Sequence, residues 1–150
     1  MAYWLMKSEP DAYSIDDLER DGVEMWDGIR NYQARNMMRD EMQVGDEIFF
    51  YHSNCKEPGI VGIAKVASLP YPDPTQFDKR SRYFDPKSDK DDPRWWLVDV
   101  EFVRKLKRNL TLTEIKAEKR LEDMILVRKG NRLSIMPVNK THWNKILRLE

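Results

Sequence analysis

Two apolar segments carry the strongest structural signal in the chain: GDEIFFYHS at residues 45–53 and IVGIAKV at residues 60–66. Aromatic and β-branched residues are typical of strands, and Gly45-Asp46 is typical of a turn. The residues between the two segments, 54–59, form a polar loop. The pattern predicts two strands that pair as a β-hairpin at the centre of a sheet.

Weaker signals predict further elements on both sides of this hairpin. Apolar runs predict strands at residues 3–6, 23–26, 95–105 and 133–138. Capping side chains predict helices from Ser14 to Gly22, Asn31 to Glu41, Thr111 or Thr113 to Met124, and Asn139 or Thr141 to Leu147. Strands outnumber helices without regular alternation, which predicts an α+β fold with a curved sheet or small barrel. The length of 150 residues predicts one domain, 1–150.

Residues 70–93 have a different composition. They hold five of the eight prolines and four aromatic residues, Tyr71, Phe77, Tyr83 and Phe84. Connections longer than about 12–15 residues are usually functional or disordered. Because this one is rich in aromatic residues, we expect it to pack onto the rest of the protein.

The charge balance is neutral but uneven along the chain. The sequence has 26 basic and 26 acidic residues. Residues 1–50 have 5 basic and 12 acidic residues, which sum to −7, while residues 101–150 have 13 and 6, which sum to +7. A protein that coats nucleic acid through charge alone needs a large net positive charge. The balance therefore excludes that class but leaves room for a local basic surface.

The sequence also bears on the cellular compartment. No apolar run approaches the roughly 18–20 residues that span a bilayer, and the N-terminus lacks the basic start of a signal peptide. The single cysteine, Cys55, excludes an internal disulfide and a multi-cysteine zinc site. These features predict a protein with no membrane association, located in the cytoplasm, or in the nucleus if the source is eukaryotic.

Catalytic and cofactor motifs are scarce. There is no glycine-rich fingerprint for phosphate groups, and His52 and His142 are not spaced as zinc ligands. Cys55 lies three residues from His52, but a polar loop is a poor platform for a catalytic dyad. The acidic run in residues 85–92 is interspersed with basic residues, which is typical of a solvated loop. We therefore expect no cofactor, no metal and no catalytic residue.

Aromatic and hydrogen-bonding residues recur together at the predicted strand ends. They lie at residues 7–8, 26–31, 51–54 and 94–96. Aromatic rings stack on flat ligands, while amide, hydroxyl and ammonium groups read ring edges, a combination that suits a flipped-out or single-stranded base. Neighbouring strand residues face opposite sides, so at most one of Trp95 and Trp96 joins a given pocket.

These motifs make the chain resemble the EVE domain, a PUA-like fold related to YTH and ASCH domains, and the thymocyte nuclear protein family that carries it. The resemblance runs nearly end to end, through WLMKSEP at 4–10, WDGIRNYQARN at 26–36, FYHSN at 50–54, GIA at 62–64, YPD at 71–73, YFDP at 83–86, RW at 94–95 and RLSIMPV at 132–138. It implies a pseudobarrel of five to six mostly antiparallel strands flanked by helices. It also implies a pocket for a modified base, such as a methylated cytosine or adenine, extruded from DNA or RNA.

The resemblance also implies roles for individual residues. Trp26 is expected to form an aromatic wall of the pocket, with Tyr83 and Trp95 as candidates for the opposite wall. The full set of expected ligand-binding residues is Lys7, Ser8, Trp26, Asn31, Tyr32, Tyr51, Ser53, Asn54, Tyr83 and Trp95. From their positive charge, Arg30 and Arg35, together with Arg39 and the basic C-terminal third of the chain, are expected to bind phosphate groups, because phosphate contacts position a strand while base contacts specify it.

Three functions fit the sequence. The first is a non-enzymatic, monomeric binding module whose partner is nucleic acid with a modified base. The second is an enzyme, an ASCH-like hydrolase or a nuclease, that acts on a nucleobase-like substrate through residues such as Lys7 and His52. The third is a protein-interaction module that uses residues 70–93.

Overall fold

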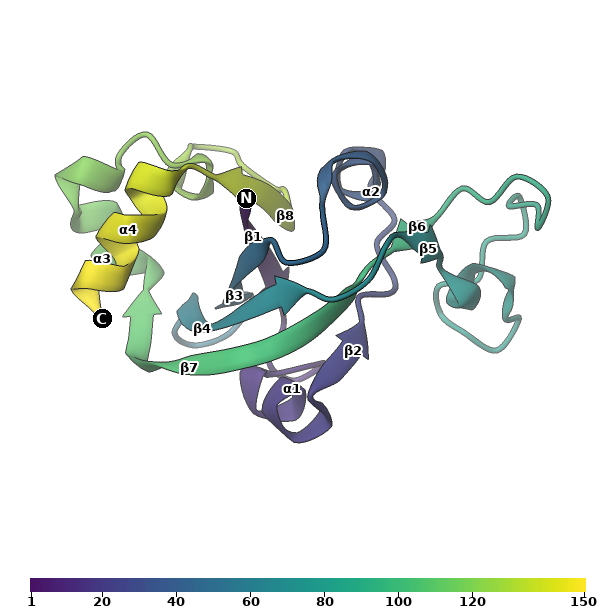
Figure 1. Cartoon of the computed structure of the whole chain (residues 1–150), viewed down its shortest axis with the longest axis horizontal. Coiled ribbons are helices and arrows are strands. Elements are labelled where there is room, and N and C mark those ends of the chain that lie inside the picture. Colours follow the sequence, from purple (N-terminus) through teal and green to yellow (C-terminus); the bar gives the residue numbers. More distant parts are fainter.

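Six strands form one curled sheet in the computed structural model, which describes residues 1–150 (Figure 1). In spatial order they are β2 (Val23–Met25), β7 (Asp99–Thr111), β4 (Gly59–Val66), β3 (Glu47–His52), β1 (Tyr3–Ser8) and β8 (Ile135–Val138). Four of the five pairings are antiparallel, and only β1 and β3 run parallel. The predicted α+β class with mostly antiparallel strands is confirmed.

The predicted hairpin lies at the centre of this sheet. β3 and β4 pair from Glu47–Lys65 to His52–Gly59, with a bulge next to Phe50. Ile48 and Phe50 pack into one apolar cluster, while Phe49 and Tyr51 pack into a second cluster on the other face. A strand that is buried on both faces requires apolar residues at successive positions, which explains the continuous run at 48–51.

Four helices flank the sheet: α1 (Ile15–Asp21), α2 (Tyr32–Asn36), α3 (Leu112–Ala117) and α4 (Lys140–Leu149). α4 covers the second cluster, where the Trp143 ring stacks on Phe49 with centroids 3.7 Å apart. Residues Met37–Glu41 continue α2 as a π-helical turn, so the helix expected to Glu41 is present. The N-caps at Ser14, Asn31, Thr111 and Asn139 are as predicted.

The single helix predicted from Thr111 to Met124 is wrong. α3 ends at Ala117, because Glu118 has an extended backbone and its side chain caps a separate 3₁₀ turn at Lys119–Leu121. A second 3₁₀ turn follows at Ile125–Val127. These turns bury Leu121, Met124 and Leu126 in one apolar cluster.

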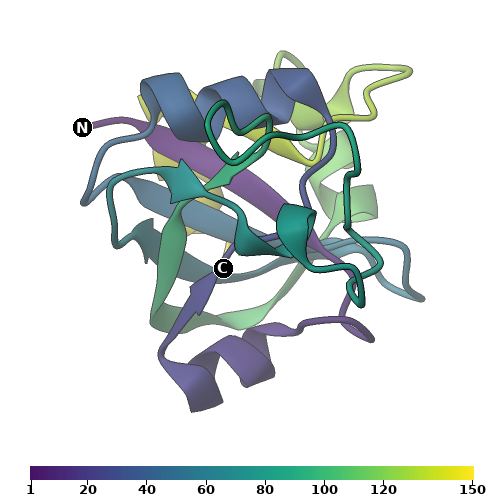
Figure 2. The ribbon, with the colours of Figure 1, turned by 90° about the vertical axis from the view of Figure 1, so that its right-hand side faces the viewer.

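The predicted strand at 95–105 is also divided. β6 (Trp96–Leu97) pairs with β5 (Tyr71–Pro72) in a separate two-stranded sheet, and β7 begins only at Asp99. Between β5 and β6 the chain makes a 3₁₀ turn at Pro74–Phe77 and a long loop. Figure 2 shows this segment crossing in front of the curled sheet.

The segment packs on the protein, as predicted: the Gly28 N–H donates to the Asp73 carboxylate, and Arg30 donates to the Tyr83 carbonyl oxygen. Within the segment, the side chain of Gln76 is buried. Its amide donates to the carbonyl oxygens of Asp73 and Trp95 and accepts from the Trp95 N–H and the Ser88 hydroxyl. Every donor and acceptor of this amide is therefore satisfied without water. Among the helices, none has the length and apolar character needed to cross a membrane.

Candidate functional site

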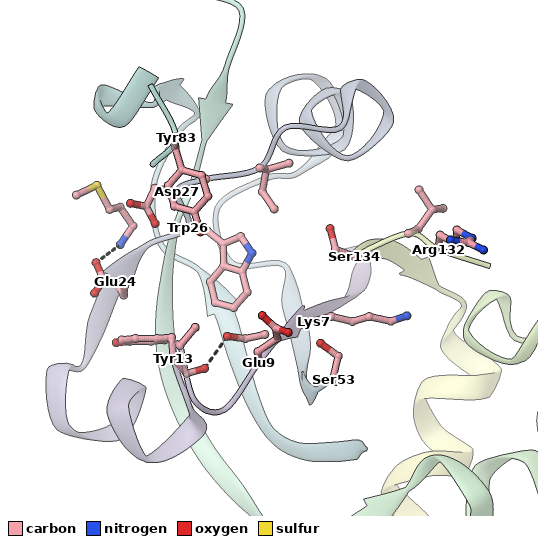
Figure 3. Close-up of a pocket in the computed structure, with 16 residues that line it drawn as sticks. Lys7, Glu9, Tyr13, Glu24, Trp26, Asp27, Ser53, Tyr83, Arg132 and Ser134 are labelled. Atoms are coloured by element: carbon pink, nitrogen blue, oxygen red, sulfur yellow. Dashed lines mark hydrogen bonds between the residues drawn. The ribbon is translucent and has the colours of Figure 1, made fainter. Parts of the chain in front are cut away.

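A cavity of about 550 Å³ opens where the ends of β1, β2 and β3 meet the start of β8 (Figure 3). Its lining comes from four chain segments that are far apart in sequence, plus Tyr83 from the long loop. The lining residues are Lys7, Ser8, Glu9, Ala12, Tyr13, Glu24, Met25, Trp26, Asp27, Gly28, Ile29, Ser53, Tyr83, Arg132, Leu133 and Ser134. Five expected site residues are among them: Lys7, Ser8, Trp26, Ser53 and Tyr83.

Trp26 belongs both to the core and to the cavity wall. Its ring packs edge-on against Phe50, with centroids 5.6 Å apart, and only 7% of its surface is exposed. Its backbone N–H donates to the carbonyl oxygen of Val98. Figure 3 shows the indole among the lining residues, next to Tyr83. A ring held from behind in this way presents a preorganised flat surface to the cavity.

Tyr83 reaches the cavity because residue 28 is glycine. A Cβ on Gly28 would lie 2.6 Å from the Tyr83 ring, and the φ of +81° is one that residues with side chains rarely adopt. The Gly28 N–H donates to the Asp73 carboxylate at 2.8 Å. The loop after β2 and the loop after β5 therefore meet directly at this point.

Arg30 fastens these two loops together. Its guanidinium donates to the carbonyl oxygens of Tyr83 and Ile29, to the Asp73 carboxylate at 3.1 Å and to the Thr75 hydroxyl. These bonds use all five N–H donors of the side chain. The phosphate-binding role expected for Arg30 does not fit this arrangement, because no donor is left for a phosphate. Arg30 instead positions the Tyr83 wall.

Tyr32 and Trp95 lie outside the cavity, contrary to expectation. Their rings stack on each other with centroids 4.8 Å apart, and the Trp95 ring NH donates to the Asp85 carboxylate. The Arg35 guanidinium lies over the outer ring, 4.6 Å from the Tyr32 centroid, and donates to the Arg94 carbonyl oxygen. The stack attaches the long loop to α2.

The other expected residues outside the cavity also have structural partners. The Asn31 side chain caps α2 by accepting from the Ala34 N–H, and the Asn54 amide donates to Glu9. Tyr51 is buried in the core, and burial, with a smaller contribution from Cys55, raises its pKa to about 12. Asparagine caps helices as readily as it binds ligands, and tyrosine fills cores as well as pockets, so the sequence pattern alone does not separate these roles.

The polar groups of the cavity are divided by charge. Glu24 and Asp27 lie toward one end, Lys7 and Arg132 lie toward the other, and Glu9 lies between the two groups (Figure 3). Burial, and then the nearby Asp73 carboxylate, raise the pKa of Asp27. Burial lowers the pKa of Lys7. Both side chains are partly buried at the cavity.

The sequence reasoning missed several lining residues. Glu9, Glu24 and Asp27 supply the carboxylates, and residues 132–134 form the wall before β8. The motif RLSIMPV at 132–138 belongs to the resemblance but had no assigned chemistry. Only a long-range contact brings this motif to the cavity. The Lys7 N–H donates to the Ser134 carbonyl oxygen at 2.8 Å.

The structure gives no support for metal or dyad chemistry. No three His, Cys, Asp or Glu side chains gather as a metal site requires. His52 Nε2 accepts from the Ile15 N–H at 3.1 Å, and burial lowers its pKa. The imidazole is therefore engaged at the start of α1.

The curled sheet, flanking helices and cavity at the strand ends define a PUA-like pseudobarrel. The family model of the EVE domain matches residues 2–149. The chain belongs to the EVE domain family, so the expectation from the motifs is confirmed.

Relatives cover nearly the whole chain. Human thymocyte nuclear protein 1 is 44% identical over 168 residues, which cover 99% of this chain and 74% of that protein. A crystal structure of a Pseudomonas syringae protein is 53% identical, with a TM-score of 0.95 and 99% coverage of both chains. The crystal structure of human THYN1 protein in complex with 5-methylcytosine-containing DNA is 43% identical, with a TM-score of 0.94 and coverage of 99% and 97%.

Proposed function

We propose that this protein is a non-enzymatic binding module that accepts a modified nucleobase, of the methylated cytosine type, from nucleic acid. One observation carries the proposal: the cavity beside Trp26 and Tyr83 occurs in a chain 43% identical to a protein whose structure was solved with 5-methylcytosine-containing DNA. The two structures share the fold over nearly the whole of both chains, with a TM-score of 0.94.

The chemistry of the cavity suits such a base. Its volume of about 550 Å³ falls within the roughly 300–1,000 Å³ typical of ligand pockets. Trp26 and Tyr83 offer aromatic surfaces for stacking, and Ile29 and Leu133 offer apolar surface for a methyl group. Carboxylates accept hydrogen bonds from the exocyclic amino group of cytosine. Asp27 and Glu24 therefore favour amino-bearing bases over thymine or uracil.

The direct test is a titration with matched oligonucleotides that differ only in one base. Single-stranded and duplex DNA, and the corresponding RNA, each carry cytosine or 5-methylcytosine at the central position. We expect tighter binding of the modified strand, measured by fluorescence anisotropy. Equal affinity for modified and unmodified strands in every format contradicts the proposal. A preference for modified RNA over modified DNA would identify RNA as the partner.

Substitution of Tyr83 tests whether the cavity is the binding site. Removal of a stacking ring costs about 1–3 kcal/mol of binding free energy. We expect Tyr83→Ala to lose binding by that amount, while Tyr83→Phe retains the ring and most of the affinity. The Tyr83 carbonyl still accepts from Arg30 in both variants, so the loop stays attached. Unchanged affinity in Tyr83→Ala would show that the base binds outside this cavity.

Catalysis on a nucleobase is the alternative, because the shifted pKa values of Lys7 and Asp27 are of a kind also found in active sites. Incubation with nucleosides and short oligonucleotides, followed by product analysis, separates the two functions. We expect no turnover. Product formation that disappears in a Lys7→Met variant would show that the protein is an enzyme and not only a binding module.

The proposal includes a monomeric single domain, 1–150, in the cytoplasm, or in the nucleus of a eukaryotic cell. The curated human relative is named a nuclear protein. Light scattering with and without the modified oligonucleotide measures the mass, and a dimer in either state contradicts the monomer. Fluorescent fusion in cells of the source organism tests the location.

A further inference from the structure

We propose that the loop of residues 128–132, together with Lys7, binds phosphodiester groups of a nucleic-acid strand at the basic end of the cavity. The proposal uses the proposed function only to place the base in the cavity. The phosphate contacts themselves are measurable with unmodified strands.

Arg132 lines the cavity, and two further cations, Arg128 and Lys129, precede it in the same loop. Arg128, Lys129 and Arg132 are exposed, and their side chains make no ion pair and no hydrogen bond. The sequence contains no acidic residue between Asp123 and Glu150. Their positive charge is therefore not neutralised by neighbours along the chain.

Several other cations of the C-terminal third are already paired. Arg104 binds Glu150, Lys105 binds Asp16 and Arg108 binds Glu114. The excess of +7 in residues 101–150 is thus concentrated in fewer side chains than the composition suggests. Three of these unpaired cations lie in the loop at 128–132.

The backbone of this loop has a defined shape. The Asn131 N–H donates to the Arg128 carbonyl oxygen at 3.1 Å, and the Asn131 side chain accepts from the Leu133 N–H. Gly130 has a φ of +79°, which closes the turn. The turn therefore fixes the backbone that carries the three cations, which lowers the ordering cost when they bind a strand.

Lys7 adds a fourth cation from β1. The hydrogen bond between its N–H and the Ser134 carbonyl oxygen places it beside the residues that follow the loop. Its ammonium group lies half-buried over the Tyr51 ring, 5.6 Å from the centroid, and has no carboxylate partner. Lys7 and Arg132 lie at the same end of the cavity (Figure 3).

The separation of charge determines on which side of the cavity the phosphates of a bound nucleotide lie. Phosphates are attracted to the end with Lys7 and Arg132 and repelled from the end with Glu24 and Asp27. A base that occupies the space beside Trp26 therefore has its phosphates on the side of residues 128–132. Arg30, on the opposite loop, has no free donor that would compete for them.

The test compares two triple variants that remove the same charge. The first is R128Q/K129Q/R132Q, and the control is K116Q/K119Q/R120Q, whose three cations lie in the same C-terminal third but outside the loop that leads into the cavity wall. All six side chains are exposed, so both variants retain the fold. Affinity for an unmodified single-stranded oligonucleotide is measured between about 50 and 200 mM salt.

We expect the first variant to lose about tenfold or more in affinity at the low-salt end. Its salt dependence, the slope of log K against log salt, decreases by about 0.7 for each lost phosphate contact on a single strand. Three contacts change the slope by about 2, and the control variant changes it much less. Equal changes in the two variants, or no change in the first, overturn the proposal.

A second measurement separates this inference from the function of the cavity. The ratio of affinities for modified and unmodified strands should stay the same in the double variant R128Q/K129Q, because neither residue lines the cavity. If the protein shows no preference for modified bases but the slope still falls, the proposed function fails and the phosphate site stands. If the protein prefers modified bases but the salt dependence of the variant is unchanged, the proposed phosphate site is wrong and the proposed function stands.

Small ligands identify the source of the phosphate. The nucleoside and the 5′-monophosphate of 5-methyldeoxycytidine are titrated against wild type and Arg132→Gln. Tighter binding of the monophosphate that is lost in Arg132→Gln assigns the site to the phosphate of the bound nucleotide. Equal binding of both small ligands, with loss only for oligonucleotides, assigns it to the neighbouring phosphodiesters. No loss with either ligand class overturns the proposal.

Discussion

Two loops on opposite sides of the cavity carry arginines, and the structure uses them differently. Arg30, in the loop after β2, donates all five of its hydrogen bonds to protein acceptors. Arg132, in the loop before β8, makes no hydrogen bond or ion pair and lies at the cavity rim. One arginine builds the wall, and the other remains available to a ligand.

The difference follows from what surrounds each guanidinium. The Asp73 carboxylate next to Arg30 is 1% exposed and also accepts from the backbone of Gly28 and Thr75. A buried carboxylate needs a cation or several donors, so the site requires Arg30 to stay. Arg132 forms no ion pair, so no buried carboxylate depends on it. Two arginines therefore have different roles, and what distinguishes them is how many of their side-chain N–H donors are already hydrogen-bonded to the protein.

The largest expected effect is on stability when Arg30 is replaced. Arg30→Gln removes the bonds to the Tyr83 carbonyl and leaves the Asp73 carboxylate without its cation, so we expect a loss of roughly 2–4 kcal/mol in the free energy of unfolding. Arg132→Gln should change it by less than about 0.5 kcal/mol, as exposed substitutions do. Urea denaturation of both variants measures the two values.

Arg30→Lys is the matched control for charge. Lysine retains the positive charge but not the planar set of five donors, so we expect it to recover only part of the loss. If Arg30→Lys were as stable as wild type, charge alone would hold the loops. If Arg30→Gln and Arg132→Gln were equally stable, the contrast between the two loops would be lost.

A smaller effect is expected at Gly28, where the two loops touch. Gly28→Ala places a methyl group against the Tyr83 ring and also strains a backbone with φ of +81°. Gly22→Ala is the matched control, since its φ is +79° and nothing lies within 4 Å of its Cβ position. Both variants should lose about 1–3 kcal/mol of stability from backbone strain.

Only Gly28→Ala should also weaken the binding of a modified oligonucleotide, because only there does the new methyl group displace the Tyr83 wall. The measurement is the oligonucleotide titration, repeated with both variants under conditions where both are folded. Equal affinities of the two variants would show that Tyr83 can shift without consequence for the ligand.

The comparison between the loops also shows how far the sequence can be interpreted. The hairpin of residues 45–66 is predictable, because strands buried on both faces need continuous apolar runs. The helix caps are predictable from local chemistry, as Ser14 and Asn139 show. Trp26 and Tyr83 lie at the cavity as expected from their motifs.

The rest depends on contacts between distant residues. Nothing near Arg30 in the sequence indicates that Asp73, Thr75 and Tyr83 will use its donors. The parallel pairing of β1 with β3 joins residues about 44 positions apart, and it places Lys7 beside Tyr51. Residues 132–134 join the cavity only through the pairing of β8 with β1.

The smallest expected effect concerns His52, another polar side chain whose acceptor is in use. Burial lowers the pKa of its imidazole, although the Asp16 carboxylate opposes this shift, and Nε2 accepts from the Ile15 N–H. The unfolded chain takes up a proton near the ordinary value of about 6.5, whereas the folded protein resists until a lower pH. Protons therefore favour the unfolded state in that window, and stability should fall as the pH decreases below about 6.5.

Urea denaturation at a pH of about 7.5 and again about 5.5 measures this decrease, with the window set by the ordinary histidine pKa. His52→Gln should be less stable at both values, because it disturbs the start of α1, but its decrease between them should be smaller than in wild type. His142→Gln removes the other histidine and should keep the full decrease, because His52 is intact. If His52→Gln and wild type lost the same stability on acidification, the imidazole would be free to take a proton. It would then resemble Arg132, an available group, rather than Arg30, an engaged one.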